Sequence, residues 1–148
     1  GPDRIVNAEA AYREYGGGLI VVDAGTAVTF CVILEGGVFD GGIIAPGPGT
    51  GAWALSARAA RLPEAAFEPP PRMAARNTRD AVQSGIYHGW HCLIDGLIAR
   101  IEEEYGRELT TVLTGGYAGR LDLRRKIVRD EELTMKGIRY VYDLNRGA

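Results

Sequence analysis

The sequence contains little cysteine and little histidine, with two residues of each among 148. Cys31 and Cys92 do not form a pattern of metal ligands, and both lie in apolar runs, so we predict reduced thiols in the core of a cytosolic protein. His88 and His91 stand close together on a predicted helix, but no third ligand is near them. These few residues therefore predict neither a disulfide framework nor a zinc site.

Long apolar runs and a strong net charge are also missing. No segment approaches the roughly 20 apolar residues that span a bilayer, and no signal peptide is recognisable. The net charge of −2 gives no long-range attraction to nucleic acid or to an anionic membrane. With 46% hydrophobic and 24% charged residues, the composition is that of a globular protein. We expect a single cytoplasmic domain with neither nucleic acid nor a membrane as its partner.

Three common catalytic signatures are absent from the chain. It has no G-x-x-x-x-G-K-[ST] loop, and the glycines at 47, 49 and 51 do not match the G-x-G-x-x-G pattern. No serine lies in a G-x-S-x-G turn. The sequence thus lacks the usual P-loop, the dinucleotide-binding motif of Rossmann folds and the nucleophile elbow of the α/β-hydrolases.

The hydrophobic pattern of the first part predicts a helix and then a strand meander. Residues 4–15 carry apolar positions at helical spacing, and a run of glycines ends them. Three apolar runs follow, which predict strands over 18–25, 27–37 and 38–47 with a tight turn between the last two. The first run is apolar throughout, so we expect it to be covered on both faces of the sheet.

The second part is predicted to be mainly helical. We expect residues 47–51 to stay outside any helix and a helix to run from Ala52 until Pro63 stops it. A buried strand over 110–119 and a last helix over about 133–145 follow the long central helix. This order of elements is typical of a ribonuclease-H-like α/β domain, with a mixed sheet and helices packed on it.

The longest predicted element is a helix over 77–106, with Asn77 or Thr78 as its cap. Gly85 and Gly89 lie one turn apart, which suggests that another backbone approaches this side of the helix. The spacing predicts one buried apolar stripe, formed by Val82, Ile86, Trp90, Leu93, Leu97 and Ile101. A second side carries Gly85, Gly89, Gly96 and Ile94.

Glycine corners follow the predicted strands at 23–26, 46–49 and 114–116. Ligands collect at strand ends in layered sheets, and backbone N–H groups exposed beside glycine bind phosphate oxygens. Asp23 could hold a cation, and Thr26 could donate its hydroxyl to a phosphate. A plain β-hairpin turn explains the first corner alone, whereas the three corners together predict a nucleotide site.

The first four residues place an acid and a guanidinium side by side before a helix. In one interpretation, Asp3 caps this helix. In the other, Asp3 takes the proton of a substrate hydroxyl while Arg4 binds a carboxylate with both ends of its guanidinium. The residues alone leave both interpretations open.

Several segments in one order resemble the type III pantothenate kinases, of the superfamily that includes acetate and sugar kinases, actin and the 70-kDa heat-shock ATPases. The resemblance rests on GPDRIVNAEAAY, VVDAGTAVTF, GGIIAPG, ALSARAARLP, NTRDAVQSGIYHGW, LTGGYAG and LTMKGIRYVYDLN. The chain departs from the family where Ala75-Arg76 replaces the usual Gly-Lys before Asn-Thr. Neither replaced residue has an assigned role.

The resemblance implies a role for each matched residue. Asp3 matches the catalytic base, and Asp23 matches the ligand of a monovalent cation, K⁺ or NH₄⁺. The segment that binds pantothenate matches Gly1, Pro2, Asp3 and Arg4, and Thr78 matches a further pantothenate contact. The ATP contacts match Gly25, Thr26, Gly115 and Gly116.

The implied reaction is the first step of coenzyme A biosynthesis, in which ATP with Mg²⁺ phosphorylates the hydroxyl of pantothenate. Residues 1–148 resemble only the C-terminal half of such a kinase, and we expect the N-terminal ATPase-like half to be absent from this chain. We also expect a homodimer built on the long helix, with Thr78 near the subunit contact. Two alternatives stay open: a non-catalytic fragment or regulatory homologue, and another small-molecule kinase of the superfamily.

Overall fold

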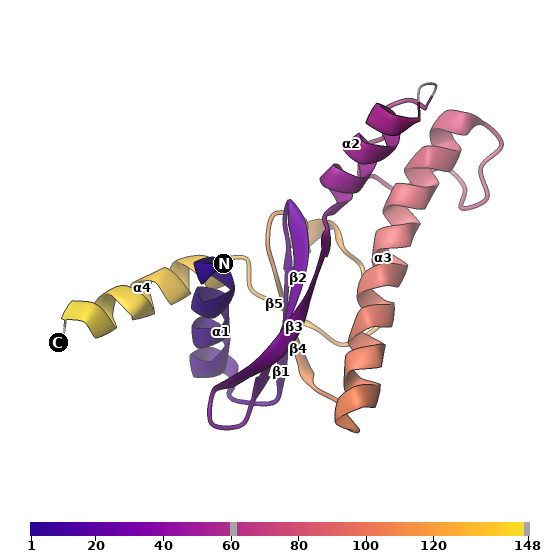
Figure 1. Ribbon diagram of the computed structural model, residues 1–148. Helices are drawn as coiled ribbons and strands as arrows, with labels where there is room; N and C mark the ends of the chain where they lie inside the picture. The colour runs from indigo at the N-terminus through magenta and orange to yellow at the C-terminus, as the bar shows by residue number, and fades with distance from the viewer. Residues whose placement is uncertain (60–61, 147–148) are drawn as a thin grey trace.

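The computed structural model describes residues 1–59 and 62–146, which form a five-stranded sheet with helices on both faces (Figure 1). The strand order is β3-β2-β1-β4-β5. The meander strands β2 and β3 run antiparallel to their neighbours, whereas β4 and β5 are parallel to theirs. The bounds are β1 (Leu19–Ala24), β2 (Ala27–Leu34), β3 (Val38–Pro46), β4 (Thr110–Thr114) and β5 (Val128–Arg129). The predicted mixed sheet is therefore confirmed, although the sequence pattern missed the two-residue β5.

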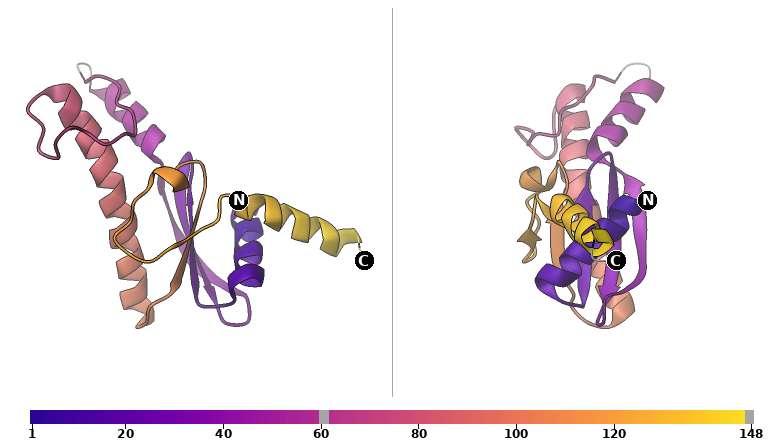
Figure 2. Two further views of the ribbon diagram at one scale, coloured as in Figure 1. Left: turned by 180° about the vertical axis from the view of Figure 1, so that it is seen from behind. Right: turned by 90° about the vertical axis from the view of Figure 1, so that its left-hand side faces the viewer.

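The central strand β1 is covered on both faces, as its continuous apolar run predicts. Helix α1 (Pro2–Tyr15) lies on one face and α3 (Thr78–Tyr105) on the other, as Figures 1 and 2 show. Because strand side chains alternate, Val21 joins the cluster under α1 and Val22 joins the cluster under α3. This arrangement brings the start of α1 to the same edge of the sheet as the end of β1.

Helix α3 begins and ends as the sequence predicts, but its buried stripe differs. The side chain of Asn77 caps it by accepting a 2.9 Å hydrogen bond from the backbone N–H of Asp80, and Gly106 ends it at φ 64°. The prediction placed Ile94 on a second face, yet Ile94 and Ile98 are fully buried whereas Leu93 and Leu97 are only half-buried. Ile86, Trp90, Ile94 and Ile98 follow one another at intervals of four residues. They therefore lie on one side of the helix, which faces the sheet.

Helix α2 spans Pro48–Arg58, so the prediction of a start at Ala52 was wrong. Pro48 occupies the first helical position, where its ring geometry is favourable and its missing N–H costs nothing. Gly51 lies against the ring of Trp90 on α3, where a Cβ would come within 3.0 Å of the indole, so this helix contact favours glycine. Helix α2 and the start of α3 extend together beyond the strand ends (Figure 1).

Helix α4 (Leu133–Arg146) confirms the predicted last helix and packs against α1. Buried Asp130 joins these elements, because it accepts 2.8 Å hydrogen bonds from the hydroxyl of Tyr15 and the ammonium of Lys136. A single 3₁₀ turn at Ala118–Arg120 follows β4. The rest of α4 points away from the sheet (Figure 2).

Both cysteines are free thiols, but only one lies in the core. Cys31 is buried on β2, whereas Cys92 is exposed on α3, contrary to the prediction. The apolar run around Cys92 is helical, so only part of it faces the sheet. None of the helices in residues 1–59 and 62–146 has the length and apolar character required to cross a bilayer.

Candidate active site

The first and third glycine corners meet at the edge of the sheet where β1 and β4 end. Asp23 lies opposite Thr29 of β2 and opposite Thr114 of β4 in the strand register. Residues paired in this way point to the same face of a sheet, so one carboxylate lies between two hydroxyls. This face is the one that α1 covers.

Asp23 is the electrostatic centre of this edge. Burial raises the pKa of its carboxyl above 3.8, and the negative charge of Asp3 raises it further. A hydrogen bond from the side-chain amide of Asn7 to Oδ2 of Asp23, 2.9 Å long, opposes this rise. The ionised carboxylate is therefore only partly compensated, and a cation beside it would favour the charged form.

Glycine is required at position 115 by both conformation and space. Its φ of 95° is strained for residues with a side chain, and a Cβ there would overlap Oδ1 of Asp23 and the backbone of Ala24. The turn is fastened by the backbone N–H of Tyr117, which donates a 2.9 Å hydrogen bond to the carbonyl of Ala24. Gly116 beside it is exposed. The third corner thus lies directly on the end of β1.

The turn after β1 is also held by the start of α2. The carbonyl of Thr26 accepts a 2.8 Å hydrogen bond from the N–H of Gly47 and a 2.7 Å bond from the hydroxyl of Thr50. The side chain of Thr26 stays exposed, and Gly25 lies beside the carboxylate of Asp23. This segment is a hairpin turn, but its fixed backbone and free hydroxyl are what a phosphate site requires.

Asp3 lies in the first turn of α1 and does not cap it. The N-cap position is Gly1, and no side-chain hydrogen bond caps this helix, so the capping interpretation was wrong. The carboxylate of Asp3 is exposed and close enough to Asp23 to affect its pKa. Arg4 is half-buried, with its guanidinium carbon 5.8 Å from the ring centre of Phe39, and its Nε has no hydrogen-bond partner among the described residues.

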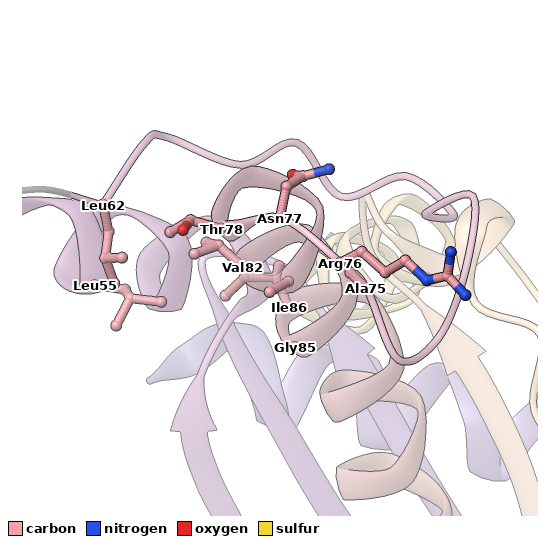
Figure 3. A pocket seen from close by; sticks show the side chains of 10 residues that line it. Leu55, Leu62, Ala75, Arg76, Asn77, Thr78, Val82, Gly85 and Ile86 are labelled. Atoms are coloured by element: carbon pink, nitrogen blue, oxygen red, sulfur yellow. The ribbon is translucent and has the colours of Figure 1, made fainter.

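Thr78 lies apart from these residues. It begins α3, on the face of the sheet opposite α1, and lines a cavity of about 740 Å³ at the far end of α2. Figure 3 shows Thr78 and Val82 facing Leu55 and Leu62, while the guanidinium of Arg76 points away. The structure therefore brings Asp23, Gly25, Thr26, Gly115 and Gly116 together near Asp3, but it does not bring Thr78 to Asp3.

Asn7 is the site residue that the sequence prediction missed. It is 2% exposed, and its Oδ1 has no hydrogen-bond partner in the described part of the chain. The only available signal was an amide among the small apolar residues on one side of α1, one turn after Asp3. Pattern reasoning gives such a residue no role until its partner, Asp23, is known.

His91 is occupied by hydrogen bonds, which explains its position without a metal. Its Nδ1 lies 2.6 Å from the carbonyl of Tyr87, and its Nε2 accepts a 3.0 Å hydrogen bond from the N–H of Asp122. No group of three or more histidine, cysteine or acidic side chains that could hold a metal ion occurs within 1–59 and 62–146.

Comparison with known sequences finds relatives that match the whole chain. A sequence profile of the type III pantothenate kinases matches residues 1–100. The type III pantothenate kinase of Maricaulis maris is 45% identical over 150 residues, and that of Brevibacillus brevis is 45% identical over 148. These matches cover 100% and 99% of the chain but 58% of each relative. The chain therefore spans a little more than half the length of these relatives.

Comparison with solved structures identifies the fold. A conserved Baf family protein from Campylobacter jejuni superposes with a TM-score of 0.62 at 23% identity, over 97% of this chain and 65% of that one. The activator of the 2-hydroxyisocaproyl-CoA dehydratase from Clostridium difficile, solved with bound ADPNP, gives 0.55 at 11% identity, over 99% and 69%. Such low identities show the fold alone, which is that of the actin-like ATPases. The family is shown by the profile match over residues 1–100: the chain belongs to the type III pantothenate kinase family.

Proposed function

We propose that the protein transfers the γ-phosphoryl group of ATP to the hydroxyl of pantothenate, the first step of coenzyme A biosynthesis. The observation that carries this proposal is the meeting of Asp3, Asp23, Thr26 and Gly115 at one edge of the sheet. A phosphate-binding turn there lies beside an exposed carboxylate that can serve as a base. The family of the chain supplies the identity of the two substrates.

The residues at this edge would have different roles in phosphoryl transfer. The turns at Thr26 and Gly115 bind the phosphates, with Gly25 and Gly116 keeping their backbone N–H groups accessible. Asp3 accepts the proton of the pantothenate hydroxyl as the new oxygen–phosphorus bond forms and the bond to the ADP oxygen breaks. Because the transition state is loose, holding the two substrates in line contributes most of the rate enhancement.

Arg4 is the proposed partner of the pantothenate carboxylate. Its Nε is buried without a hydrogen-bond partner in the described chain, so an anion beside it would satisfy a polar group that is otherwise costly to bury. The guanidinium also lines a cavity of about 540 Å³ next to Ile5 and Phe39. Gly1 and Pro2 complete this segment.

A monovalent cation, K⁺ or NH₄⁺, fits beside Asp23. Two buried oxygens in this region have no hydrogen-bond partner among the described residues, namely Oδ1 of Asn7 and Oγ1 of Thr114, whose side chains are 2% and 1% exposed. Oxygen ligands and a carboxylate with a raised pKa suit a cation of low charge density. Such an ion would offset phosphate charge, and Mg²⁺ would be held mainly through the phosphates of ATP.

We also propose a homodimer that completes the pantothenate site. Asp3 and Thr78 begin helices on opposite faces of the sheet, and in the proposed dimer Thr78 comes from the second subunit. Gly85, Gly89 and Gly96 form an exposed side of α3, and apart from the backbone of α3 itself no described atom lies within 4 Å of a Cβ built at any of them. A second helix could approach this side closely, which supports a contact along α3.

The remaining length of the relatives would supply the second ATPase-like domain. We propose that this domain closes over the nucleotide, and we place the enzyme in the cytoplasm. The proposed partners include neither nucleic acid nor a membrane.

The test is a phosphotransfer assay with ATP and pantothenate, in which phosphopantothenate is measured directly. The chain is assayed alone and together with the remaining part of the Maricaulis maris relative. Product in either assay supports the proposal. No product in both favours the non-catalytic homologue, and ATP use with another hydroxyl compound but not with pantothenate favours a different kinase of the superfamily.

A further inference from the structure

The connection between β4 and β5 begins with the proposed phosphate turn at Gly115 and then crosses to helix α3 (Figure 2). Its first part is fixed to the sheet, because the N–H of Tyr117 donates a hydrogen bond to the carbonyl of Ala24. Its next part is fixed to α3, where the N–H of Asp122 donates a 3.0 Å hydrogen bond to Nε2 of His91. The proposed reaction gives His91 no role, although this side chain holds the segment that follows the phosphate turn.

The ring of His91 is fixed both in position and in its pattern of protons. Its Nδ1 lies 2.6 Å from the carbonyl of Tyr87, so this nitrogen carries a proton and donates a hydrogen bond. Nε2 of a neutral imidazole then keeps the lone pair that the N–H of Asp122 requires. The ring stacks on Phe67 at 8° with the ring centres 5.8 Å apart, and its centre lies 4.4 Å from that of the Tyr87 ring. These contacts oppose a rotation of the ring that would exchange its two nitrogens.

Protonation of His91 would turn its acceptor into a donor. An imidazolium carries an N–H group at both nitrogens, so Nε2 could no longer accept a hydrogen bond from Asp122. Histidine is the side chain whose charge ordinarily changes between pH 5 and 8. The bond to Asp122 is therefore present in neutral solution and is lost as the imidazole becomes protonated at lower pH.

The groups around His91 do not prevent this protonation. Asp122 and Arg124 face it from the connection after β4, whereas the segment between α2 and α3 faces it with uncharged Phe67 and Met73. The titratable side chains that face it from α3 itself are Tyr87, His88, Cys92 and Asp95. The two carboxylates favour an imidazolium, and the guanidinium opposes it, as does His88 once it is protonated. At neutral pH the carboxylates outnumber the guanidinium.

We infer that neutral His91 is a positioning residue for the phosphate turn, and that its protonation weakens the binding of ATP. The inference rests on the proposed function, because it takes the nucleotide phosphates to lie at Gly115. His91 acts through Asp122, which lies between the buried side chains of Leu121 and Leu123 in the same connection. When this hydrogen bond is lost, the connection is less ordered, so ATP binding must restore that order and becomes weaker.

Calorimetric titration of the full-length protein with a non-hydrolysable ATP analogue and Mg²⁺, at about pH 7.5 and about pH 5.5, tests this role. In His91→Gln, the amide oxygen reaches the place of Nε2 and accepts from Asp122 at either pH. Between the two pH values, Kd should rise about fivefold more in the wild type than in His91→Gln, as expected for one hydrogen bond. This comparison removes the titration of the ATP phosphates and of Asp23, which both proteins share.

A second variant separates the two nitrogens of the ring. The shorter amide of His91→Asn reaches the place of Nδ1 but not that of Nε2, so it cannot hold Asp122. This variant should bind the analogue about fivefold more weakly than the wild type at about pH 7.5, with no extra loss at about pH 5.5. The control is His88→Gln, at the other histidine of the chain, which should keep the pH dependence of the wild type.

Hydrogen exchange followed by mass spectrometry reports the same bond without a ligand. The peptide that contains Asp122 should exchange faster in the wild type than in His91→Gln at about pH 5.5, and equally fast at about pH 7.5. Equal exchange at both pH values overturns the inference. Faster exchange with no difference in analogue affinity also overturns it, because His91 would then stabilise the connection without positioning the phosphate turn.

The remaining outcomes separate this inference from the proposed function. Loss of the pH dependence in His88→Gln would overturn the assignment to His91. Binding that follows the expected pattern without any formation of phosphopantothenate means that the proposed function fails while the positioning role stands. Phosphopantothenate formation with the same pH dependence of binding in the wild type and in His91→Gln means the reverse. A wild-type protein that does not bind the analogue overturns both.

Discussion

The side-chain amide of Asn7 donates a 2.9 Å hydrogen bond to Oδ2 of Asp23 and so connects α1 with the end of the central strand. This contact orients the carboxylate of Asp23 at the edge where the first and third glycine corners meet. Because Asp3 lies one helical turn before Asn7, the same helix positions the proposed base and the partner of the proposed cation ligand. The distance between the two carboxylates thus depends on how α1 packs on the sheet.

Asp23 is expected to lower the stability of the folded chain at neutral pH when no cation is bound. Burial is the main cause that raises the pKa of Asp23 in the folded state above its ordinary value of 3.8. At a pH between the unfolded and the folded pKa, the folded state therefore binds more protons than the unfolded state. Stability therefore falls as the pH rises through this window. We predict that Asp23→Asn raises the melting temperature at pH 7 by roughly 2 °C in a cation-free buffer, with no gain below about pH 4.

Thermal unfolding monitored by circular dichroism checks this prediction. Asp122→Asn is the matched control, because it makes the same change of charge at an exposed position. A lower melting temperature for Asp23→Asn at pH 7 would contradict the assignment of burial as the main cause.

Activity is expected to depend on a monovalent cation. Asp23 supplies a half-buried carboxylate with unpartnered oxygens beside it, so K⁺ or NH₄⁺ should raise turnover at fixed ATP and Mg²⁺. Asp23→Ala should abolish both the cation dependence and the use of ATP. The measurement is phosphopantothenate formation in matched sodium, potassium and ammonium buffers, and full activity in sodium alone would count against this site.

Replacement of Asp3 should affect turnover more than substrate binding. We predict that Asp3→Asn, in an active enzyme, lowers kcat by about 10² to 10⁴, the span expected for loss of a general base. Pantothenate affinity should change less, because the amide keeps the shape of the side chain. Glu14→Gln, on the same helix but at its other end, serves as the control. Near-normal turnover of Asp3→Asn would remove this residue from catalysis.

A charge on the glycine side of α3 should separate the proposed dimer. Gly89 is exposed, and a Cβ there meets no described atom within 4 Å, so Gly89→Asp should leave the single chain folded. We predict dissociation of the dimer together with weaker pantothenate binding. Sedimentation velocity measures the first effect and calorimetry the second. A wild-type protein that is active and monomeric at micromolar concentration would disprove the dimer.

Mixing two inactive variants tests whether Thr78 acts across the subunit contact. Asp3→Asn and Thr78→Val should each be nearly inactive as pure dimers. If Thr78 of one subunit completes the site of the other, random exchange leaves one intact site in half of the dimers, so about a quarter of wild-type activity should return. No recovery after verified subunit exchange would mean that the two residues do not share a site between subunits.

Local patterns in the sequence were sufficient for most of the secondary structure. The ends of α3 follow from an asparagine cap and a glycine stop, and the turn before β3 follows from Gly36 and Gly37, which adopt φ values of 80° and 75°. Such features depend on residues close together in the chain. The short strand β5 and the start of α2 were the exceptions. At the start of α2, Gly47 donates a hydrogen bond to the carbonyl of Thr26 and Gly51 lies against Trp90, and both partners are far away in sequence.

The sequence by itself determined the mixed α/β fold, the turn at Asp23–Thr26 and, through several motifs in one order, the family. Only the tertiary structure decided that Asn7 holds Asp23, that Gly115 lies against the same carboxylate, and that Thr78 lies on the opposite side of the sheet from Asp3. The physical reason is that these relationships depend on strand register and on the packing of helices against the sheet. Those contacts join residues distant along the chain, and no local pattern of residue types encodes them.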